Sequence, residues 1–187
     1  MNCLLTGVGG QGTVLASKII AQCAINRGEP ARTAETIGMA QRGGSVVSHV
    51  RLGEGAYSPI IPMGEADLII AFEPAEAVRA LPFLKEGGAV IVNNRAVKPV
   101  TDSLSKESYN GDEMLDFLRK NNPKVYVIDG EKALESIGSS KVLNLVLLGA
   151  AARMGVLGIT LQELERVIDE KIPEKFRELN KKAIRAV

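Results

Sequence analysis

Residues 3–12 read CLLTGVGGQG, and this stretch decides the fold. Its apolar run, Cys3-Leu4-Leu5, is short and leads into a glycine, as a buried parallel strand does. From Gln11 to about Asn26, apolar residues recur at the spacing of an amphipathic helix. A strand, a glycine-rich turn and a helix in this order are typical of the first unit of a Rossmann-like fold.

The glycine-rich turn predicts an anion-binding site. Gly7, Gly9 and Gly12 form the pattern G-x-G-x-x-G, in which glycines allow a tight turn and a close approach to backbone amides. The following helix N-terminus adds free N–H groups and a favourable dipole, so we expect a phosphate-bearing ligand here. A tight turn without a ligand is the alternative. The candidate residues of this loop are Gly7, Gly9, Gly10, Gln11 and Gly12.

Strands and helices alternate along the rest of the chain, which predicts an α/β fold with a mainly parallel, Rossmann-like sheet flanked by helices. A helical C-terminal segment is expected at about 131–187, where Thr160 and Glu163 have the spacing of a capping box. The length of 187 residues fits one domain, 1–187. The expected further strands are 31–36, 45–52, 67–72, 89–92 and 125–128.

Ligands of such sheets bind beyond the carboxyl ends of the strands. Four loops are expected to leave the sheet at that edge, and we expect them to converge on one site. Asn93 follows one of the strands and is therefore a further ligand-binding candidate, although asparagine is also a common turn residue at a strand exit. The four loops are Gly7–Gly12, Thr36–Gly44, Glu73-Pro74 and Asn93-Asn94.

The segment Thr36–Ser45 is the second unusual feature of the sequence. Arg42 offers a planar fork of donors, and Gly43-Gly44-Ser45 offers exposed amides, so together they can grip a carboxylate or a phosphate. A glycine loop with a solvent-facing arginine explains the same residues equally well.

Glu35 is the candidate for the acidic residue that a standard NAD site places at the end of its second strand. The later loop Gln41–Ser45 fits a standard dinucleotide fold poorly, so NAD is the second interpretation. His49 is the only histidine, and it alternates with Val50 in an expected strand. Pairing across the sheet therefore explains His49 better than catalysis does.

The composition excludes several classes of protein. The formal net charge is +1 and aromatic residues make up 4%, which argues against nucleic-acid binding. Cys3 and Cys23 form no C-x-x-C pair, so the chain by itself holds no iron–sulfur cluster or structural zinc, and a reducing compartment is expected. We see no signal peptide and no apolar stretch of the ~18 residues that a membrane span needs. We therefore expect no membrane contact and a cytoplasmic location.

Two long motifs resemble the gamma-type domain of 2-oxoacid:ferredoxin oxidoreductases. They are residues 7–12, GVGGQG, and residues 35–51, ETIGMAQRGGSVVSHVR. The stretches 66–74, ADLIIAFEP, and 87–93, GGAVIVN, extend the resemblance over nearly the whole chain. Within this family, the resemblance is greatest to the beta subunits of indolepyruvate ferredoxin oxidoreductases.

The resemblance implies a complex that oxidatively decarboxylates aryl pyruvates to aryl-acetyl-CoA and passes electrons to ferredoxin. It implies that a large catalytic subunit carries thiamine diphosphate and the iron–sulfur clusters, and that this chain is an accessory subunit, inactive alone. Gly111-Asp112-Glu113 agrees, because it breaks the Gly-Asp-Gly start of the usual thiamine motif. The resemblance also associates this domain with coenzyme A. It places the following residues towards the neighbouring subunit's active site: Glu35, Thr36, Arg42, Gly43 and Gly44.

Two other functions stay open from the sequence. One is an independent NAD(P)-binding oxidoreductase, and the other is a module that binds coenzyme A or a nucleotide without catalysis. A heteromer is expected for the accessory subunit. In isolation such a chain can self-associate, for example as a homodimer, through the face that its partner covers.

Overall fold

The structure is a computed structural model that describes residues 1–36, 43–98, 109–122 and 124–187. Within those ranges, no helix is long and apolar enough to cross a membrane. The strands are β1 (Asn2–Val8), β2 (Ala31–Thr36), β3 (Ser45–Leu52), β4 (Ala66–Ala71), β5 (Leu84–Asn93) and β6 (Val125–Ile128). The helices are α1 (Thr13–Asn26), α2 (Pro74–Ala80), α3 (Asp112–Asn121), α4 (Gly130–Ile137), α5 (Leu143–Arg153), α6 (Leu161–Lys171) and α7 (Glu174–Ile184). Two short 3-10 helices are η1 (Leu81–Phe83) and η3 (Ser140–Val142).

The strands form one sheet in the order β2-β3-β1-β4-β5-β6. The pairs β1–β4, β4–β5 and β5–β6 are parallel, whereas β3 is antiparallel to both β1 and β2. Since β2 therefore runs in the direction of β1, β3 alone opposes the other described strands. The predicted α/β fold with a mainly parallel sheet is confirmed. The antiparallel insertion of β3 between β1 and β2 was not foreseen.

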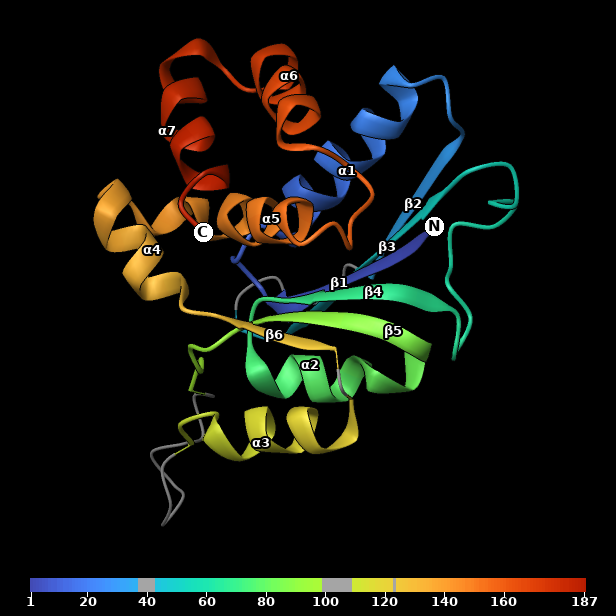
Figure 1. Cartoon of the computed structure of the whole chain (residues 1–187), viewed down its shortest axis with the longest axis vertical. Coiled ribbons are helices and arrows are strands. Elements are labelled where there is room, and N and C mark those ends of the chain that lie inside the picture. Colours follow the sequence, from blue (N-terminus) through green and yellow to red (C-terminus); the bar gives the residue numbers. More distant parts are fainter. Residues whose placement is uncertain (37–42, 99–108, 123) are drawn as a thin grey trace.

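Helices cover both faces of the sheet (Figure 1). On one face, α1 and the C-terminal helices α4–α7 lie over a large apolar core, and on the other face α2 and α3 lie over a smaller one. Strand residues alternate between the two cores, because successive side chains point to opposite faces. In β1, for example, Cys3 and Leu5 belong to the larger core and Leu4 to the smaller one.

Polar side chains at the end of α1 fasten the C-terminal helices to it, and one of them, Asn26, donates to Glu170 on α6 at 2.9 Å. Glu163 and Thr160 form the predicted capping box at the start of α6. Arg27, which follows the end of α1, forms an ion pair with Glu163 and donates to the Gly158 carbonyl at 2.9 Å. The Arg27 guanidinium is the main reason that the pKa of Glu163 is lowered to about 2. The helical C-terminal segment is therefore one packed layer with α1.

His49 fixes the long loop between β3 and β4. Its Nδ1 accepts a hydrogen bond from the Ile61 amide at 3.2 Å, and its ring packs edge-on against Phe83. Burial disfavours the imidazolium and lowers the pKa of His49. An Nδ1 that accepts a hydrogen bond must be unprotonated, so both observations favour the neutral ring. This contact is structural, but its partners are a loop amide and Phe83 rather than the cross-strand side chain that the sequence suggested.

The neutral state of His49 predicts a pH dependence of stability. Its pKa in the folded chain lies below the unfolded value of about 6.5, so only the unfolded chain gains a proton as the pH falls below that value. The free energy of unfolding should therefore decrease below about pH 6.5. In the variant His49→Asn, the amide oxygen can accept from Ile61 without titrating, and this part of the decrease should disappear. Urea unfolding at two pH values measures the free energy of unfolding of the wild type and of the variant. An equal decrease in the two proteins would contradict the neutral state of His49 in the folded chain.

Candidate functional site

The glycine loop after β1 is braced by the side chain of Gln11. The Gln11 Oε1 accepts a hydrogen bond from the Val8 amide at 2.7 Å, and its Nε2 donates to the Phe72 carbonyl at 3.2 Å. Gln11 thus joins the end of β1 to the end of β4. The helix begins at Thr13 rather than at the predicted Gln11, because Gln11 and Gly12 still belong to the turn.

Two glycines of the loop are required by their surroundings. A Cβ on Gly7 would lie 2.7 Å from the Gln11 Oε1 and 2.9 Å from the Phe72 Cβ. Gly12 has a φ of 84°, and a Cβ there would lie 2.9 Å from the Asn144 Nδ2. The absence of a side chain at Gly7 therefore leaves room for the Gln11 side chain. Gly12 permits the left-handed backbone turn into α1 and leaves room for the Asn144 side chain. These packing roles explain part of the G-x-G-x-x-G pattern without a ligand.

The segment before β3 returns to the glycine loop. The Gly9 amide donates to the Gly44 carbonyl at 2.8 Å, and the Gly43 amide donates to the Gly9 carbonyl at 3.5 Å. Ser45 extends the contact on the other side, where its hydroxyl donates to Glu76 Oε2 at 2.5 Å. The antiparallel direction of β3 causes this meeting, because it brings the start of β3 beside the end of β1.

Asn93 is the third brace at this edge of the sheet. Its side chain is 1% exposed, and its Nδ2 donates to the same Phe72 carbonyl at 3.2 Å. Its Oδ1 accepts from the Gly130 amide at the start of α4, also at 3.2 Å. Asn93 therefore connects the ends of β4 and β5 to α4, and its amide group is already engaged within the chain.

A cavity of about 560 Å³ opens beside these braces, on the side of α4 and α5. We call it the basic cavity, because among the described residues three cations, Arg95, Lys98 and Lys141, line it with one carboxylate, Glu131. Arg95 pairs with Glu131 at 2.7 Å, and Lys141 is a further cation of the lining. Gly10, Gln11, Asn93 and Gly130 line the same cavity. The cavity lies at the start of α4, whose dipole favours an anion, while the Gly130 amide itself is engaged by Asn93.

A second cavity of about 510 Å³ lies on the side of α2 and α3. We call it the carboxylate cavity, because its lining includes Glu73 and Glu76, which are 2% and 4% exposed. Glu73 accepts from the Tyr109 hydroxyl at 2.6 Å and caps α2 through the Glu76 amide at 3.0 Å. Burial and the Glu73 carboxylate raise the pKa of Tyr109. Gly43, Gly44 and Ser45 form another wall of this cavity.

Gly10, Gln11 and Asn93 line the basic cavity, Gly43, Gly44 and Ser45 line the carboxylate cavity, and the predicted Gly7, Gly9 and Gly12 line neither. Glu35 lies elsewhere, because it faces the middle of α1, where the Ser17 hydroxyl donates to its carboxylate at 3.4 Å. The Thr36 hydroxyl donates to the Val47 carbonyl at 3.1 Å. Arg42 lies outside the described residues.

The position of Glu35 argues against a standard NAD site. Such a site needs the acidic residue at the end of the strand beside β1, where it reaches the ribose of a nucleotide on the glycine loop. Here β3 separates β2 from β1 in the sheet. Glu35 is therefore one strand too far from the glycine loop for that role.

Sequence reasoning missed Arg95, Lys98 and Lys141 of the basic cavity and Tyr109 of the carboxylate cavity. Arg95 and Lys98 stand shortly after Asn93 in a stretch that was interpreted only as a loop, and Lys141 precedes an apolar helix. The signal for Arg95 and Lys98 was their place directly beyond the carboxyl end of a parallel strand. No sequence pattern pointed to Tyr109, because it meets Glu73 only in the folded chain.

Comparison with known proteins now assigns the family. A model of the pyruvate ferredoxin/flavodoxin oxidoreductase family matches residues 2–187, and the chain belongs to that family. It is 39% identical over 186 residues to the indolepyruvate oxidoreductase subunit IorB of Archaeoglobus fulgidus, covering 99% of this chain and 92% of that protein. It is 36% identical to IorB of Thermococcus kodakarensis over 184 residues, covering 97% and 91%. The resemblance inferred from the sequence motifs is confirmed.

Solved structures agree with the fold. The gamma subunit of a keto/oxoacid ferredoxin oxidoreductase from Geobacter sulfurreducens is 26% identical with a TM-score of 0.70, covering 99% of this chain and 94% of that one. A 2-oxoglutarate:ferredoxin oxidoreductase from Magnetococcus marinus has a TM-score of 0.72 at 20% identity. The match covers 99% of this chain and 30% of that one, so the same fold there is one part of a longer chain.

The bracing role of Asn93 can be measured. The variant Asn93→Ala removes a donor from the Phe72 carbonyl and the acceptor of the Gly130 amide, and should lower the free energy of unfolding by about 1–3 kcal/mol. The neighbouring Asn94→Ala is the control and should change it by less than about 0.5 kcal/mol. Denaturant titration of both variants checks this, and equal effects would contradict the brace.

Proposed function

We propose that this chain is the accessory subunit of a heteromeric 2-oxoacid:ferredoxin oxidoreductase that acts on indolepyruvate and related aryl pyruvates. The reaction joins the acyl group to coenzyme A, releases carbon dioxide and transfers two electrons to ferredoxin. Membership of the family and similarity to IorB proteins over nearly the whole chain carry the proposal. Residues 1–187 form a single gamma-type domain in this proposal.

The chemistry of the cysteines supports a separate catalytic subunit. An iron–sulfur cluster is held by several thiolates. Cys3 and Cys23 are both buried, and burial raises the pKa of the Cys3 thiol and raises that of Cys23 to about 12. These thiols do not fit a cluster, so the proposal assigns the clusters and thiamine diphosphate to the large partner subunit. Two free buried thiols also suit a cytoplasmic location.

In the proposed complex, the basic cavity receives the phosphate groups of coenzyme A. Arg95 and Lys141 supply positive charge at its wall, and the dipole of α4 adds to it. The glycine loop contributes Gly10 and Gln11 to the same wall. The carboxylate cavity and Gly43–Ser45 face the active site of the partner, as the resemblance implies for this segment.

Assembly tests the proposal most simply. The chain should co-purify with a large thiamine diphosphate-dependent, cysteine-rich subunit from the same organism when the two are expressed together. A stable heteromer that elutes as one species in size-exclusion chromatography supports the proposal. Two separate species, with the isolated chain as monomer or homodimer in both preparations, would contradict it.

The ligand of the basic cavity can be tested in the assembled complex. Lys141→Glu reverses one charge of the cavity and should weaken coenzyme A binding by about tenfold, the effect expected for loss of a charged contact to phosphate. Lys182→Glu on α7 makes the same change of charge on an exposed helix and should leave the affinity unchanged. Calorimetric titration measures both. Pantetheine lacks the nucleotide phosphates, and its binding should not distinguish the variants.

A further inference from the structure

An apolar groove of about 870 Å³ lies between the end of α2, the start of β5 and the second half of α3. Val78, Leu81 and Leu84 line it on one side, and Phe117 lines it from α3. Phe117 is 47% exposed, although it stands on a helix whose neighbours Leu115 and Leu118 are buried. An aromatic side chain held in the open by a rigid helix is typical of the anchors that dominate binding energy at interfaces.

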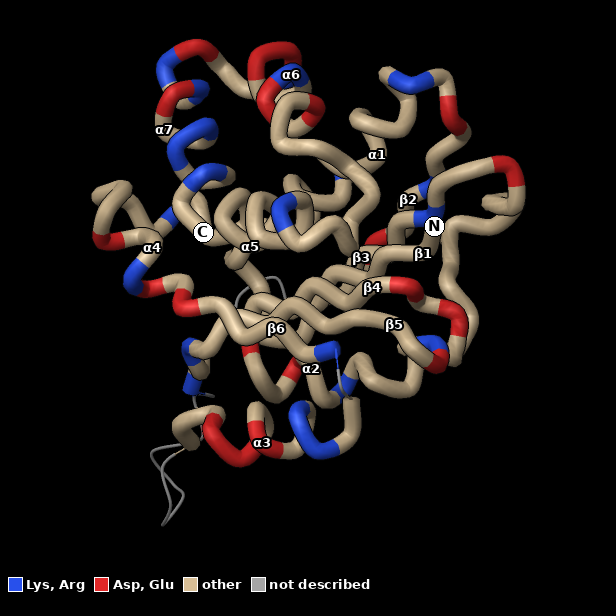
Figure 2. Tube along the Cα trace, in the orientation of Figure 1, with Lys and Arg blue, Asp and Glu red and all other residues tan. Residues whose placement is uncertain are grey.

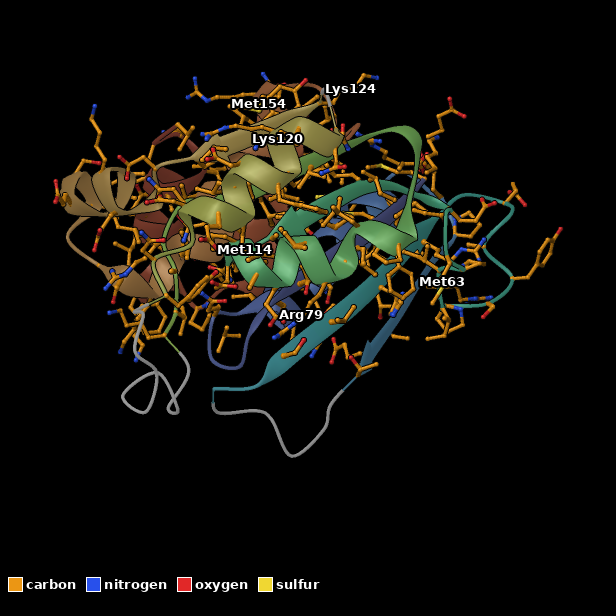
Figure 3. The ribbon with its side chains drawn as sticks, turned by 90° about the horizontal axis from the view of Figure 1, so that it is seen from below. Met63, Arg79, Met114, Lys120, Lys124 and Met154 are labelled. Carbon is orange, nitrogen blue, oxygen red and sulfur yellow. The ribbon has the colours of Figure 1, made fainter. Side chains whose placement is uncertain are left out.

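The groove is continuous with the carboxylate cavity. Val78 of α2 lines both of them. On α3, Met114 lines the carboxylate cavity, while Phe117 and Asn121 line the groove. Spacings of three and four residues place these side chains in one row along the helix. Figure 3 looks onto this layer, with Met114 on α3 and Arg79 on α2.

At the end of the groove, Lys120 and Lys124 outnumber the lining carboxylate Glu86, while the lining Lys85 pairs with Asp67. The first turn of α3 is acidic and its last turn is basic, as Figure 2 shows. Lys120 precedes Asn121 in that turn, and the Lys124 Nζ donates to the carbonyl of Gly87, a groove residue, at 3.0 Å. Within the described part of the chain, neither lysine has a carboxylate partner, whereas Arg119 pairs with Asp116. A complementary surface therefore carries apolar side chains flanked by carboxylates.

We propose that the large subunit of the complex docks in this groove, with an apolar side chain against Phe117 and carboxylates opposite Lys120 and Lys124. The inference rests on the proposed function, because the occupant is the partner of that complex. The continuity of the two hollows points to this occupant. In the proposed function the partner covers Gly43–Ser45, which line the carboxylate cavity. A surface that extends from there along Met114 and Phe117 of α3 reaches the groove. The helical layer of α2 and α3 is then the docking face, while α6 and α7 stay exposed.

Phe117→Asp tests the anchor, and Phe176→Asp is a matched control. Phe176 is 44% exposed on α7, on the opposite side of the sheet. We expect Phe117→Asp to weaken binding of the purified large subunit at least about tenfold, and Phe176→Asp to leave it unchanged. Thermal unfolding of both variants verifies that each is folded, as the exposure of both side chains leads us to expect.

Lys120→Glu tests the charge without touching the apolar groove. It should weaken assembly strongly at low salt and less at high salt, because the lost attraction is screened by ions. If the wild-type chain assembles and both Phe117→Asp and Lys120→Glu assemble equally well, the docking face is wrong while the proposed function stands. If the wild-type chain itself does not bind the large subunit, the proposed function fails and the docking face with it.

Discussion

The carbonyl oxygen of Phe72 is the contact on which the candidate site depends. It receives hydrogen bonds from the side-chain amides of both Gln11 and Asn93. These bonds join the ends of β1, β4 and β5 at the carboxyl edge of the sheet, and Asn93 adds the start of α4 through Gly130. Buried amide groups are costly to leave unpaired, so this arrangement holds the edge in one conformation. Both neighbouring cavities take their shape from it.

The reversed direction of β3 is the second constraint. A strand parallel to β1 in this position would bring its carboxyl end, rather than its start, beside the glycine loop. Because β3 is antiparallel, Gly43 and Gly44 pair with Gly9, and Ser45 reaches Glu76 on α2. Two motifs that lie far apart in the sequence therefore become one surface. The same insertion moves Glu35 away from the glycine loop and makes a standard dinucleotide site a poor fit.

Much of the fold could be predicted from the sequence, because a buried strand such as β4 contains a continuous apolar run, 68–71, and the Thr160–Glu163 cap has a distinct spacing. The direction of β3 could not be predicted, since alternation of apolar residues is the same in both directions. Gly7, Gln11 and Asn93 were correctly brought together at one edge. Their bracing role was missed, because it depends on the Phe72 carbonyl, a backbone atom that no side-chain pattern reveals. Arg95 and Lys141 meet only through the packing of α4 and α5.

Under the proposed function, these features suit a subunit that supplies walls of a shared site, with the redox centres on the partner. Its two thiols are buried, its bracing amides are engaged, and its open surfaces are a basic cavity, a carboxylate cavity and an apolar groove. In the proposed complex, such a chain completes a site whose reactive groups belong to the large subunit.

The most direct measurement is the rate of dye reduction with indolepyruvate and coenzyme A by the purified large subunit, with and without this chain. The account predicts that neither subunit is active alone and that adding this chain restores turnover. A large subunit that works equally fast without it would contradict the account.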